Sequence, residues 1–418
     1  MEQLNYQTVV IGGGAAGLTA ATVWGRRCGK GQVLLLEKQS KIGRKLLATG
    51  NGRCNISHQA VSPEHYHGDR HLIKSVLSRW SVDDLTAFFQ RLGVWLRSDD
   101  EGRLYPYTNQ AVTIRDALWR ECERQGVQER LSCSIVGIRR TGGQFVVATD
   151  DRTIRCGTLV IACGSKAAPS LGADDSGYQL LKQLGIGHTQ LFPSLCPVTT
   201  AEKYRSLKGV RAKGKAVLLR DGKPLQETAG EIQFTDHGLS GICIFELSRA
   251  VNEYFACGTM AGQSCQTVQI ALDLLPDHSF QEVYAFLENS RRLFTKETAD
   301  RLLSGILPQP LAEVLAQRCR SKNKTCASLT ARDLKQLVSE AKHLLFTPEK
   351  AGDFAAAQVC AGGVDSRFVD PATLMSRSIK NLFLCGEVLD VDGDCGGYNL
   401  HFAVGSAFLT ACLSDNRT

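Results

Sequence analysis

The stretch TVVIGGGAAGLTAATVWGRRCGKGQVLLLE, residues 8–37, decides the fold. It opens with a short β-branched run, continues through Gly12-x-Gly14-x-x-Gly17 into an apolar helical segment, and ends in the apolar run VLLL before Glu37. In such a unit the first glycine permits a tight turn, the second lets the backbone approach a pyrophosphate, and the third lets helix pack on strand. The pattern predicts a βαβ unit that binds a dinucleotide.

The residues around these glycines have matching roles. The helix N-terminus directs its unpaired N–H groups and the positive end of its dipole at the phosphates. Glu37 ends the second strand, where a carboxylate accepts hydrogen bonds from both ribose hydroxyls and repels a phosphorylated ribose. We therefore expect these residues to bind the cofactor: Gly12, Gly14, Ala15, Ala16, Gly17, Glu37 and Lys38.

Length and composition describe an ordinary globular chain. With 418 residues, 43% hydrophobic and 22% charged, it should hold roughly two to three structural units. No apolar run approaches the roughly 18 residues of a membrane span, and the N-terminus lacks a basic leader. The sixteen cysteines are scattered without a Cys-x-x-Cys pair, which is typical of reduced, buried thiols. We expect a cytoplasmic protein with no membrane partner.

Much of the positive charge behind the net charge of +7 is concentrated in two places. One is the segment from Arg26 to Arg53, and the other is Arg318, Arg320, Lys322 and Lys324 at the end of an expected helix. No zinc-finger, RNA-recognition or basic-zipper pattern accompanies the second cluster. A solvated face is therefore favoured over a phosphate or RNA contact, and nucleic acid is not expected as a partner.

Two later segments favour FAD over NAD as the dinucleotide. They are GTLVIACG (157–164) and IKNLFLCGEVLDVDGDCGGYNLHFAVGSAFLTACL (379–413). FAD is long enough to need the last strand of the fold as well as the first, so Glu387 is expected to bind the ribityl hydroxyls. The turn GDCGGYN is expected to aim a helix N-terminus at the flavin ring, whose reduced form is negatively charged. The expected contacts are Val136, Ala162, Cys163, Gly164, Gly386, Glu387, Asp392, Gly397, Tyr398, Asn399 and Leu400.

These motifs, together with GRKLLATGNGRCN, FTDHGLSG and CAGGV, resemble the BaiN/YhiN-type flavoprotein family over nearly the whole chain. The resemblance implies an NAD(P)/FAD-dependent oxidoreductase with an FAD domain like that of the fumarate reductase flavoprotein. Activities described for the family are reduction of conjugated 3-oxo bile acids and oxidation of aminoacetone. This chain has Thr49-Gly50-Asn51-Gly52 where the family tends to have Ser-Gly-Gly-Gly. It also has Thr235-Asp236-His237-Gly238 where the family has Thr-His-x-Gly.

The segment GRKLLATGNGRCN, residues 43–55, has neither helical nor strand periodicity. After the second strand the chain must return across the pyrophosphate toward the flavin ring. Its glycines permit backbone contact, and Lys45 or Arg53 would neutralise phosphate charge. Cys54 is expected to pack beside the flavin rather than to exchange disulfides, because no partner cysteine is adjacent. The expected contacts are Lys45, Thr49, Gly50, Asn51, Gly52, Arg53, Cys54 and Asn55.

About 165 residues between the two halves of the FAD domain read as an insert. Short alternating runs and the Asp221-Gly222 turn predict a small β-barrel or sandwich. The later part has a period near 3.6, and capping boxes begin at Ser279 and Thr330. The predicted plan is an α/β, Rossmann-like FAD-binding domain interrupted by a small β-barrel and a helical subdomain that cover the flavin. Its boundaries are 1–190 (FAD domain), 191–275 (β-rich), 276–345 (helical) and 346–418 (FAD domain).

Three further constellations have alternative interpretations. The run DVDGDC (390–395) resembles a calcium loop, but Cys395 and His401 occupy the positions that require glycine and glutamate. The histidines His58, His65, His67 and His71 fit no zinc spacing, and a mobile surface loop is the favoured interpretation. No metal is expected. His237 is either a catalytic acid or base or a structural turn residue.

The functional prediction is an FAD-dependent oxidoreductase that exchanges a hydride between flavin N5 and a small organic substrate. NAD(P)H is the expected reductant, docking transiently because no second GxGxxG follows a strand. The alternatives are an oxygen-dependent amine or alcohol oxidase, and a flavoprotein of tRNA modification or redox sensing. The candidate catalytic residues are His237, Arg53 and Asn399.

Overall fold

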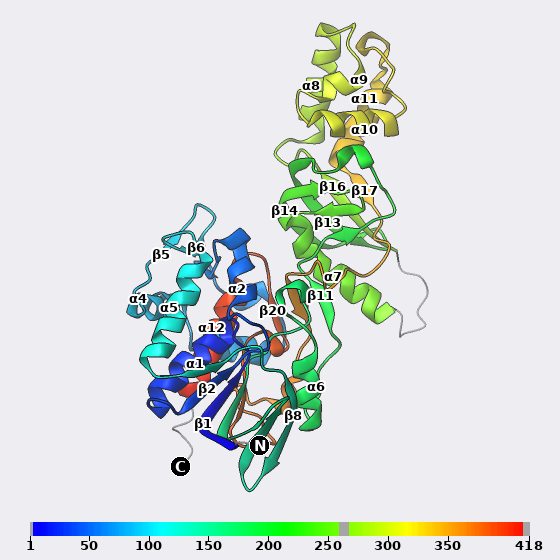
Figure 1. The fold of residues 1–418 in the computed structure, drawn as a ribbon. Coiled ribbons are helices and arrows are strands. Elements are labelled where there is room, and N and C mark those ends of the chain that lie inside the picture. The colour runs from blue at the N-terminus through cyan, green and yellow to red at the C-terminus, as the bar shows by residue number, and fades with distance from the viewer. Residues whose placement is uncertain (1–2, 259–266, 413–418) are drawn as a thin grey trace. The chain divides into compact units, whose positions relative to one another are not determined.

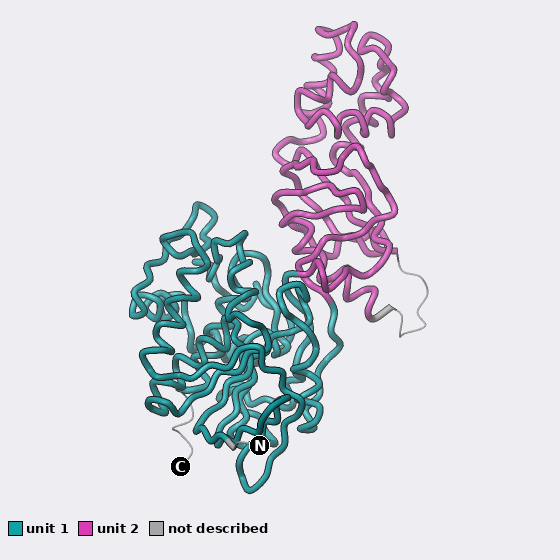
Figure 2. The backbone as a smooth tube through the Cα atoms, viewed as in Figure 1, with its two compact units in different colours: residues 1–192, 358–418 teal, residues 193–357 magenta. Residues whose placement is uncertain are grey.

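The computed structural model describes residues 3–258 and 267–412. The chain forms two compact units (Figure 2): unit 1 consists of Met1–Phe192 and Gln358–Thr418, and unit 2 of Pro193–Ala357. Each unit has its own hydrophobic core. Unit 2 is therefore an insertion within the chain of unit 1.

The centre of unit 1 is a seven-stranded sheet in the order β7-β2-β1-β10-β9-β8, with β19 also pairing with β10 (Figure 1). Its strands are β1 (Gln3–Ile11), β2 (Val33–Leu36), β7 (Gln128–Arg130), β8 (Ile135–Thr141), β9 (Gln144–Thr149), β10 (Thr153–Ile161) and β19 (Leu382–Leu384). The pairs β1–β2, β1–β10, β2–β7 and β10–β19 are parallel. All four residues of β2 are buried, as expected where helices cover a parallel sheet.

Unit 1 also contains helices, some of which pack on this sheet and others on neighbouring helices. They are α1 (Ala15–Cys28), α2 (Arg44–Ala48), α3 (Arg70–Leu77), α4 (Val82–Arg91), α5 (Ala111–Arg124), α6 (Ser176–Gln183) and α12 (Tyr398–Cys412). Figure 1 shows α1 in blue beside α12 in red, and the Trp24 Nε1–H donates to Thr410 Oγ1 between them at 3.0 Å. The predicted βαβ unit is confirmed by β1, α1 and β2, and the first and last helices of the chain pack together.

Short elements complete unit 1. They are β3 (Ser57–His58), β4 (Tyr66–Gly68), β5 (Leu96–Ser98), β6 (Arg103–Pro106) and β20 (Val391–Gly393), and the 3-10 turns η1 (Thr49–Gly52), η2 (Pro63–His65), η3 (Pro169–Leu171), η6 (Ser366–Phe368) and η7 (Gly386–Val388). Strand β4 pairs antiparallel with β20. This pairing joins segments from opposite ends of the sequence. Two further strands, β11 (Phe192–Ser194) and β18 (Val359–Ala361), stand where the chain leaves and re-enters unit 1.

Unit 2 begins with an antiparallel sheet in the order β12-β15-β14-β13-β16-β17. Its strands are β12 (Val198–Thr199), β13 (Arg211–Arg220), β14 (Lys223–Phe234), β15 (Gly238–Ser240), β16 (Val268–Asp273) and β17 (Leu344–Phe346), with η4 (Arg205–Leu207) before β13. The outer strands meet through the Thr200–Pro348 bridge, so the sheet closes on itself. Helix α7 (Ile242–Gly258) packs on β14. The predicted barrel and the Asp221-Gly222 hairpin turn are confirmed.

The rest of unit 2 is helical: α8 (Phe280–Leu293), α9 (Ala299–Leu303), α10 (Gln309–Arg318), η5 (Cys326–Ser328) and α11 (Ala331–Lys342). Ser279 accepts from the Glu282 N–H and Thr330 accepts from the Asp333 N–H, and in each pair the acidic side chain returns a bond to the cap backbone. Both predicted capping boxes are confirmed. The expected α/β class, with an inserted barrel and helical subdomain, is thus the fold of this chain.

Candidate functional site

The glycine-rich turn between β1 and α1 combines tight packing with open space. Gly12 has φ +104°, and a Cβ there would lie 2.5 Å from the carbonyl oxygen of Ala162. A Cβ at Gly17 would collide with the carbonyl oxygen of Gly12. A Cβ at Gly14, in contrast, would meet no atom within 4 Å. The outer glycines are therefore needed by the fold, whereas Gly14 faces a space that a pyrophosphate can enter.

Glu37 lies beside this turn at the end of β2. Its Oε2 accepts from the Gly13 N–H at 2.6 Å and its Oε1 accepts from the Gln39 N–H at 2.8 Å. These bonds hold the carboxylate in one orientation and leave further lone pairs for ribose hydroxyls. Lys38, which the sequence suggested as a further cofactor contact, forms a 2.5 Å ion pair with Asp174.

The segment 49–55 has an unusual backbone. Asn51 and Cys54 adopt φ values of 55° and 60°, and Gly50 and Gly52 flank them with positive φ. Left-handed non-glycine residues are held by their surroundings and gather at ligand sites. Arg53 is exposed: its Nε–H donates to the Gly50 carbonyl at 3.2 Å, and its guanidinium lies 5.0 Å from the Tyr105 ring centroid.

Cys54 is fully buried, and burial raises the pKa of its thiol to about 12. Burial raises the pKa of Cys163 to about 12 as well. Both thiols are protonated at neutral pH, so neither is a ready nucleophile. This environment supports the packing role that the sequence suggested for Cys54.

Two buried polar atoms near the expected cofactor path lack hydrogen-bond partners among the described residues. One is Asn55 Oδ1, which lies next to Gly397: a Cβ added at Gly397 would be 2.6 Å from it. The other is the Tyr178 hydroxyl on α6, whose pKa is raised well above its usual value by burial and by the neighbouring Cys360. An unpaired buried polar atom costs about 1–3 kcal/mol. A polar ligand such as FAD would satisfy both, and the residues around this path therefore fit it.

Glu387 is held by three partners. Its Oε2 pairs with Lys45 Nζ at 2.7 Å, and its Oε1 accepts from Ser165 Oγ at 2.6 Å and from the Cys360 N–H at 3.0 Å. Lys45 was expected to neutralise phosphate and Glu387 to bind the ribityl chain. In the structure the two form an ion pair with each other. Gly386 allows η7 to approach α1, since a Cβ there would lie 2.6 Å from Ala16 Cβ.

A second glycine-rich turn precedes α12. Gly396 and Gly397 have φ values of 126° and 100°, and Tyr398 is the first residue of the helix. Asn399 clamps the turn: its Oδ1 accepts from the Gly393 N–H at 2.8 Å and its Nδ2 donates to the Gly393 carbonyl at 2.7 Å. The amide thus positions the turn, while the first N–H groups of α12 have no acceptor within the helix.

An acid and two histidines meet beside the start of α12. Asp394 Oδ2 lies 3.0 Å from His65 Nδ1, and Asp394 Oδ1 lies 3.0 Å from His67 Nε2. The His65 ring stacks on the Tyr398 ring at 4.4 Å and the His58 ring on the same ring at 5.1 Å. Burial would raise the pKa of Asp394, but the bonds from His67 and His65 lower it overall. The predicted mobile histidine loop is wrong, because β3, η2, β4 and α3 contain these histidines.

His401, one turn into α12, is buried beneath this turn. Its Nδ1 lies 2.8 Å from Ser57 Oγ and its Nε2 lies 3.3 Å from the Trp80 carbonyl. Burial lowers its pKa to about 4, so the ring is neutral at physiological pH. The carbonyl accepts from Nε2–H, and Nδ1 accepts from the serine hydroxyl.

Two sequence candidates make none of the contacts described above. His237 belongs to unit 2, in the turn between β14 and β15, with 77% of its side chain exposed and Asp236 at 3.9 Å. Val136 is on β8 and is 61% exposed. Other expected contacts flank the two glycine-rich turns and the 49–55 segment: Ala15 and Ala16 in α1, Thr49 in η1, Ala162 and Gly164 after β10, Asp392 in β20 and Leu400 in α12.

Sequence reasoning missed Tyr178, His65 and Asp394. Asp394 was weighed only as part of a calcium-like run, and His65 only as a zinc ligand. The available signal was the combination of an acidic turn and a histidine-rich segment, but the pairing of β4 with β20 was needed to connect them. Among the described residues, no helix is long and apolar enough to cross a membrane.

Comparison with known proteins agrees with this geometry. The model of the HI0933-like protein Rossmann domain family matches residues 6–413. A 3-dehydro-bile acid delta(4,6)-reductase of Clostridium scindens is 34% identical, and a ribosomal RNA dihydrouridine synthase of Haemophilus influenzae is 30% identical; each match covers 98% of both chains.

Among solved structures, 3-ketosteroid delta1-dehydrogenase from Sterolibacterium denitrificans superimposes with a TM-score of 0.52 at 12% identity, over 98% of this chain and 99% of that chain. At this identity the likeness concerns the fold. The full-length match and the glycine-rich turns together show that this chain belongs to the HI0933-like Rossmann family.

Proposed function

We propose that this FAD-dependent oxidoreductase reduces a carbon–carbon double bond conjugated to a carbonyl group. The support is a chemistry that two differently named relatives share. A 3-dehydro-bile acid delta(4,6)-reductase saturates double bonds next to a 3-oxo group, and a dihydrouridine synthase saturates the bond of uracil that is conjugated to its carbonyl. A scaffold shared by both reactions points to the enone, rather than to the rest of the substrate, as the reacting group.

The chain has groups suited to binding FAD. The open face of Gly14 and the N-terminus of α1 would receive the pyrophosphate, and Glu37 the adenosine ribose. Asn55 Oδ1 and the Tyr178 hydroxyl would gain their missing partners. The N–H groups at the start of α12 would stabilise negative charge on the reduced ring. Once reduced, bound FAD would supply a hydride from its N5 atom.

The electron donor in this proposal is NAD(P)H, which reaches the flavin only transiently. The sequence holds one GxGxxG after a strand, and that motif belongs to the FAD turn. We therefore expect flavin reduction to saturate weakly with NADH or NADPH. A tight nucleotide complex formed before any bleaching of the flavin would contradict this step.

The test separates the two half-reactions of the purified protein. Denaturation should release FAD and not FMN. Under anaerobic conditions NADH or NADPH should bleach the flavin, and 4-androstene-3,17-dione, a cyclic enone, should then restore its colour and yield the saturated ketone. Reoxidation by oxygen with amine or alcohol substrates, and none by enones or uracil, would instead support an oxidase.

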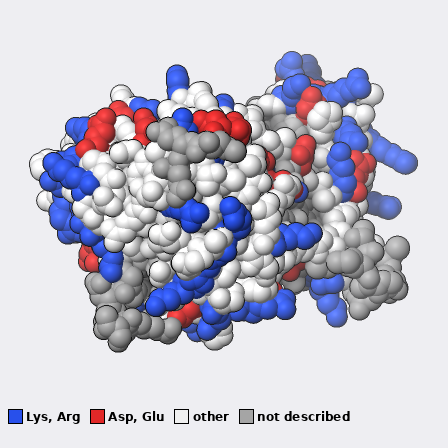
Figure 3. Space-filling model, turned by 60° about the horizontal axis from the view of Figure 1, so that its bottom comes forward, with Lys and Arg blue, Asp and Glu red and all other residues white. Residues whose placement is uncertain are grey.

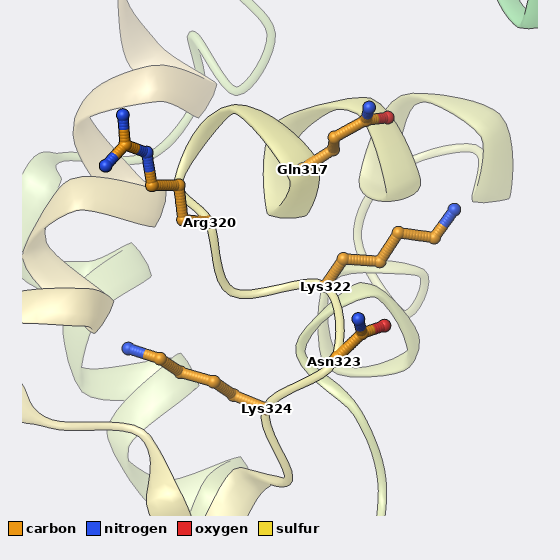
Figure 4. Close-up of a pocket in the computed structure, with 5 residues that line it drawn as sticks. All are labelled: Gln317, Arg320, Lys322, Asn323 and Lys324. Atoms are coloured by element: carbon orange, nitrogen blue, oxygen red, sulfur yellow. The ribbon is translucent and has the colours of Figure 1, made fainter.

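A second substrate, a uracil base in structured RNA, is favoured by one feature of unit 2. A pocket of about 440 Å³ at the end of α10 is lined by Gln317, Arg320, Lys322, Asn323 and Lys324 (Figure 4). Arg320 and Lys324 extend to one side and Lys322 to the other. Cations that diverge suit an extended phosphate backbone better than a single small anion.

Charge in this pocket is partly compensated. Lys324 pairs with Asp333 at 2.7 Å and Lys322 with Glu313 at 3.6 Å, whereas Arg320 makes no ion pair with a described residue. On the face shown in Figure 3, Lys and Arg are scattered among neutral residues rather than gathered into one patch. Arg320 is therefore the side chain on which an RNA contact in this pocket would chiefly depend.

The RNA candidate is tested with deproteinised ribosomal RNA as the oxidant of the reduced flavin and as the ligand in a salt titration. RNA affinity that falls steeply with salt, and dihydrouridine in the product, would support it. Arg320→Ala should weaken binding, and Lys335→Ala, which removes an exposed cation from α11 of the same subdomain, should weaken it less. An equal loss of RNA affinity in both variants would show that this pocket is not a specific RNA contact.

A further inference from the structure

The reduction proposed above needs a proton as well as a hydride. A hydride adds to the carbon β to the carbonyl, and an acid must then protonate the α-carbon. Histidine is the side chain best suited to give and regain a proton near neutral pH. The described part of unit 1 has one place where imidazoles and a carboxylate meet at the start of α12, and this is the His65–Asp394–His67 cluster.

The cluster is rigidly attached to the α12 turn. The Asp394 N–H donates to the His65 carbonyl at 2.9 Å, and Tyr66 Oη–H donates to the Tyr398 carbonyl at 3.0 Å. Antiparallel pairing of β4 with β20 holds both strands in register. His65 is thereby fixed against Tyr398, the first residue of the helix that is expected to face the flavin.

The two histidines differ in how they use their nitrogens. His65 bonds Asp394 through Nδ1, which leaves Nε2, at the tip of the ring, without a partner among the described residues, and its side chain is 37% exposed. His67 bonds Asp394 through Nε2, so the tip of its ring is already occupied. His58 has both nitrogens occupied, by the Ala60 N–H and the Glu101 carbonyl. His65 therefore combines an available nitrogen at the ring tip with stacking on the first residue of α12.

We propose that His65, held by Asp394, is the acid that protonates the substrate. This inference rests on the proposed function. Two electrons arrive with the hydride from the reduced flavin at the β-carbon, and the α-carbon takes the Nε2 proton of the His65 imidazolium. The π bond is replaced by two C–H bonds, and His65 is left neutral with its proton on Nδ1, where Asp394 accepts it. Water returns the Nε2 proton, and NAD(P)H reduces the flavin again.

Groups from every neighbouring element set the charge around His65. They are Glu64 in η2, Arg70 in α3, His67 and Tyr66 in β4, His58 in β3, and Asp394 and Tyr398 at the start of α12. Asp394 contacts His65 directly and holds its ring through the Nδ1 bond. Asp394 is thus a positioning residue that acts through His65.

The first experiment measures half-reactions of His65→Gln and His67→Gln in FAD-loaded protein. Both variants should keep FAD and be reduced at the wild-type rate. Reoxidation by 4-androstene-3,17-dione or ribosomal RNA should slow by about 10²-fold or more in His65→Gln, the range for loss of a general acid, and far less in His67→Gln. Equal slowing in both would overturn the assignment of His65. Failure of the wild-type protein to be reoxidised by either compound would count against the proposed function instead.

The second experiment needs no turnover. An imidazole that gains charge near the flavin shifts its absorption bands, so the oxidised holoprotein should show a reversible spectral change between about pH 5 and 8. The change should vanish in His65→Gln and persist in His67→Gln. A wild-type spectrum independent of pH, or a shift that survives in His65→Gln, would show that His65 does not lie at the flavin.

Discussion

The two glycine-rich turns of unit 1 are similar in form and different in content. Each delivers the N-terminus of a long helix, α1 after Gly12–Gly14 and α12 after Gly396–Gly397, and the two helices pack together. The first turn has no ionisable side chain, and Glu37 supports it from β2. The second turn contains Asp394, whose carboxylate bonds His65 in η2 and His67 in β4.

This difference separates binding from chemistry. Pyrophosphate binding needs backbone N–H groups and close approach, which glycines provide and side chains obstruct. Proton transfer needs titratable groups held by partners. The same strand–turn–helix arrangement would therefore bind the cofactor at one end of the chain and form the proposed reaction site at the other.

Substitution of the glycines should break the first turn most severely. Gly17→Ala puts a Cβ against the Gly12 carbonyl, so we expect unfolding to become easier by about 3 kcal/mol or more and FAD to be lost. Gly14→Ala meets no protein atom and should leave the melting temperature of FAD-free protein nearly unchanged while FAD occupancy falls. Calorimetry with FAD quantification measures both. Comparable destabilisation by the two variants would contradict the division of roles among these glycines.

Acid should lower the free energy of unfolding through His401, which is buried beneath the second turn. The folded protein disfavours protonated His401, whose pKa burial lowers from 6.5 to about 4. Neutral His401 contributes fully to the free energy of unfolding above pH 6.5. This contribution is lost as the pH falls toward 4, because the histidine of the unfolded chain then binds a proton that the folded chain binds more weakly. The loss should be about 3 kcal/mol, because each tenfold change in proton affinity corresponds to roughly 1.4 kcal/mol.

Urea unfolding at pH 6.5 and at pH 4 measures this loss. His401→Gln is the control, because glutamine does not titrate and should flatten this part of the pH dependence. A slope that remains unchanged in the variant would assign the acid sensitivity to other groups.

Substitution of Glu37 should weaken FAD binding at the first turn without changing the rate of the reaction at the second. Glu37→Gln should weaken FAD by roughly 1.5–3 kcal/mol, the range for hydrogen bonds to a charged group. At saturating FAD, reoxidation of the reduced flavin by enone should remain at the wild-type rate. Fluorescence titration of FAD and stopped-flow absorbance provide the two values, and unchanged affinity would mean that another residue holds the ribose.

Cys54→Ser should have the smallest effect. The thiol is fully buried, and its pKa of about 12 keeps it protonated. A buried serine hydroxyl should cost about 1 kcal/mol of stability, and flavin reduction should stay within about tenfold, or 1.4 kcal/mol of barrier. Loss of turnover with full FAD in this variant alone would indicate disulfide chemistry, because a hydroxyl cannot form a mixed disulfide.

Local sequence patterns were sufficient to predict those structural elements whose interacting residues are close in the sequence. The β1–α1–β2 unit, both capping boxes and the Asp221-Gly222 hairpin were all readable, because turns and caps depend on a few consecutive residues. The histidines were misread as a surface loop because β4 is only three residues long and has too little periodicity to be recognised. The ion pair between Lys45 and Glu387 could not be predicted from the spacing of these residues in the sequence.

By itself the sequence determined the nucleotide-binding turn, since the clash at Gly17 involves Gly12, five residues earlier, and follows from backbone sterics alone. Only the tertiary structure decided the proposed acid. Asp394 and His65 are 329 residues apart, and Glu387 and Lys45 are 342 apart. Such pairs form only when strand pairing and helix packing have brought the two ends of the chain together, and a hydrogen bond depends on that final geometry.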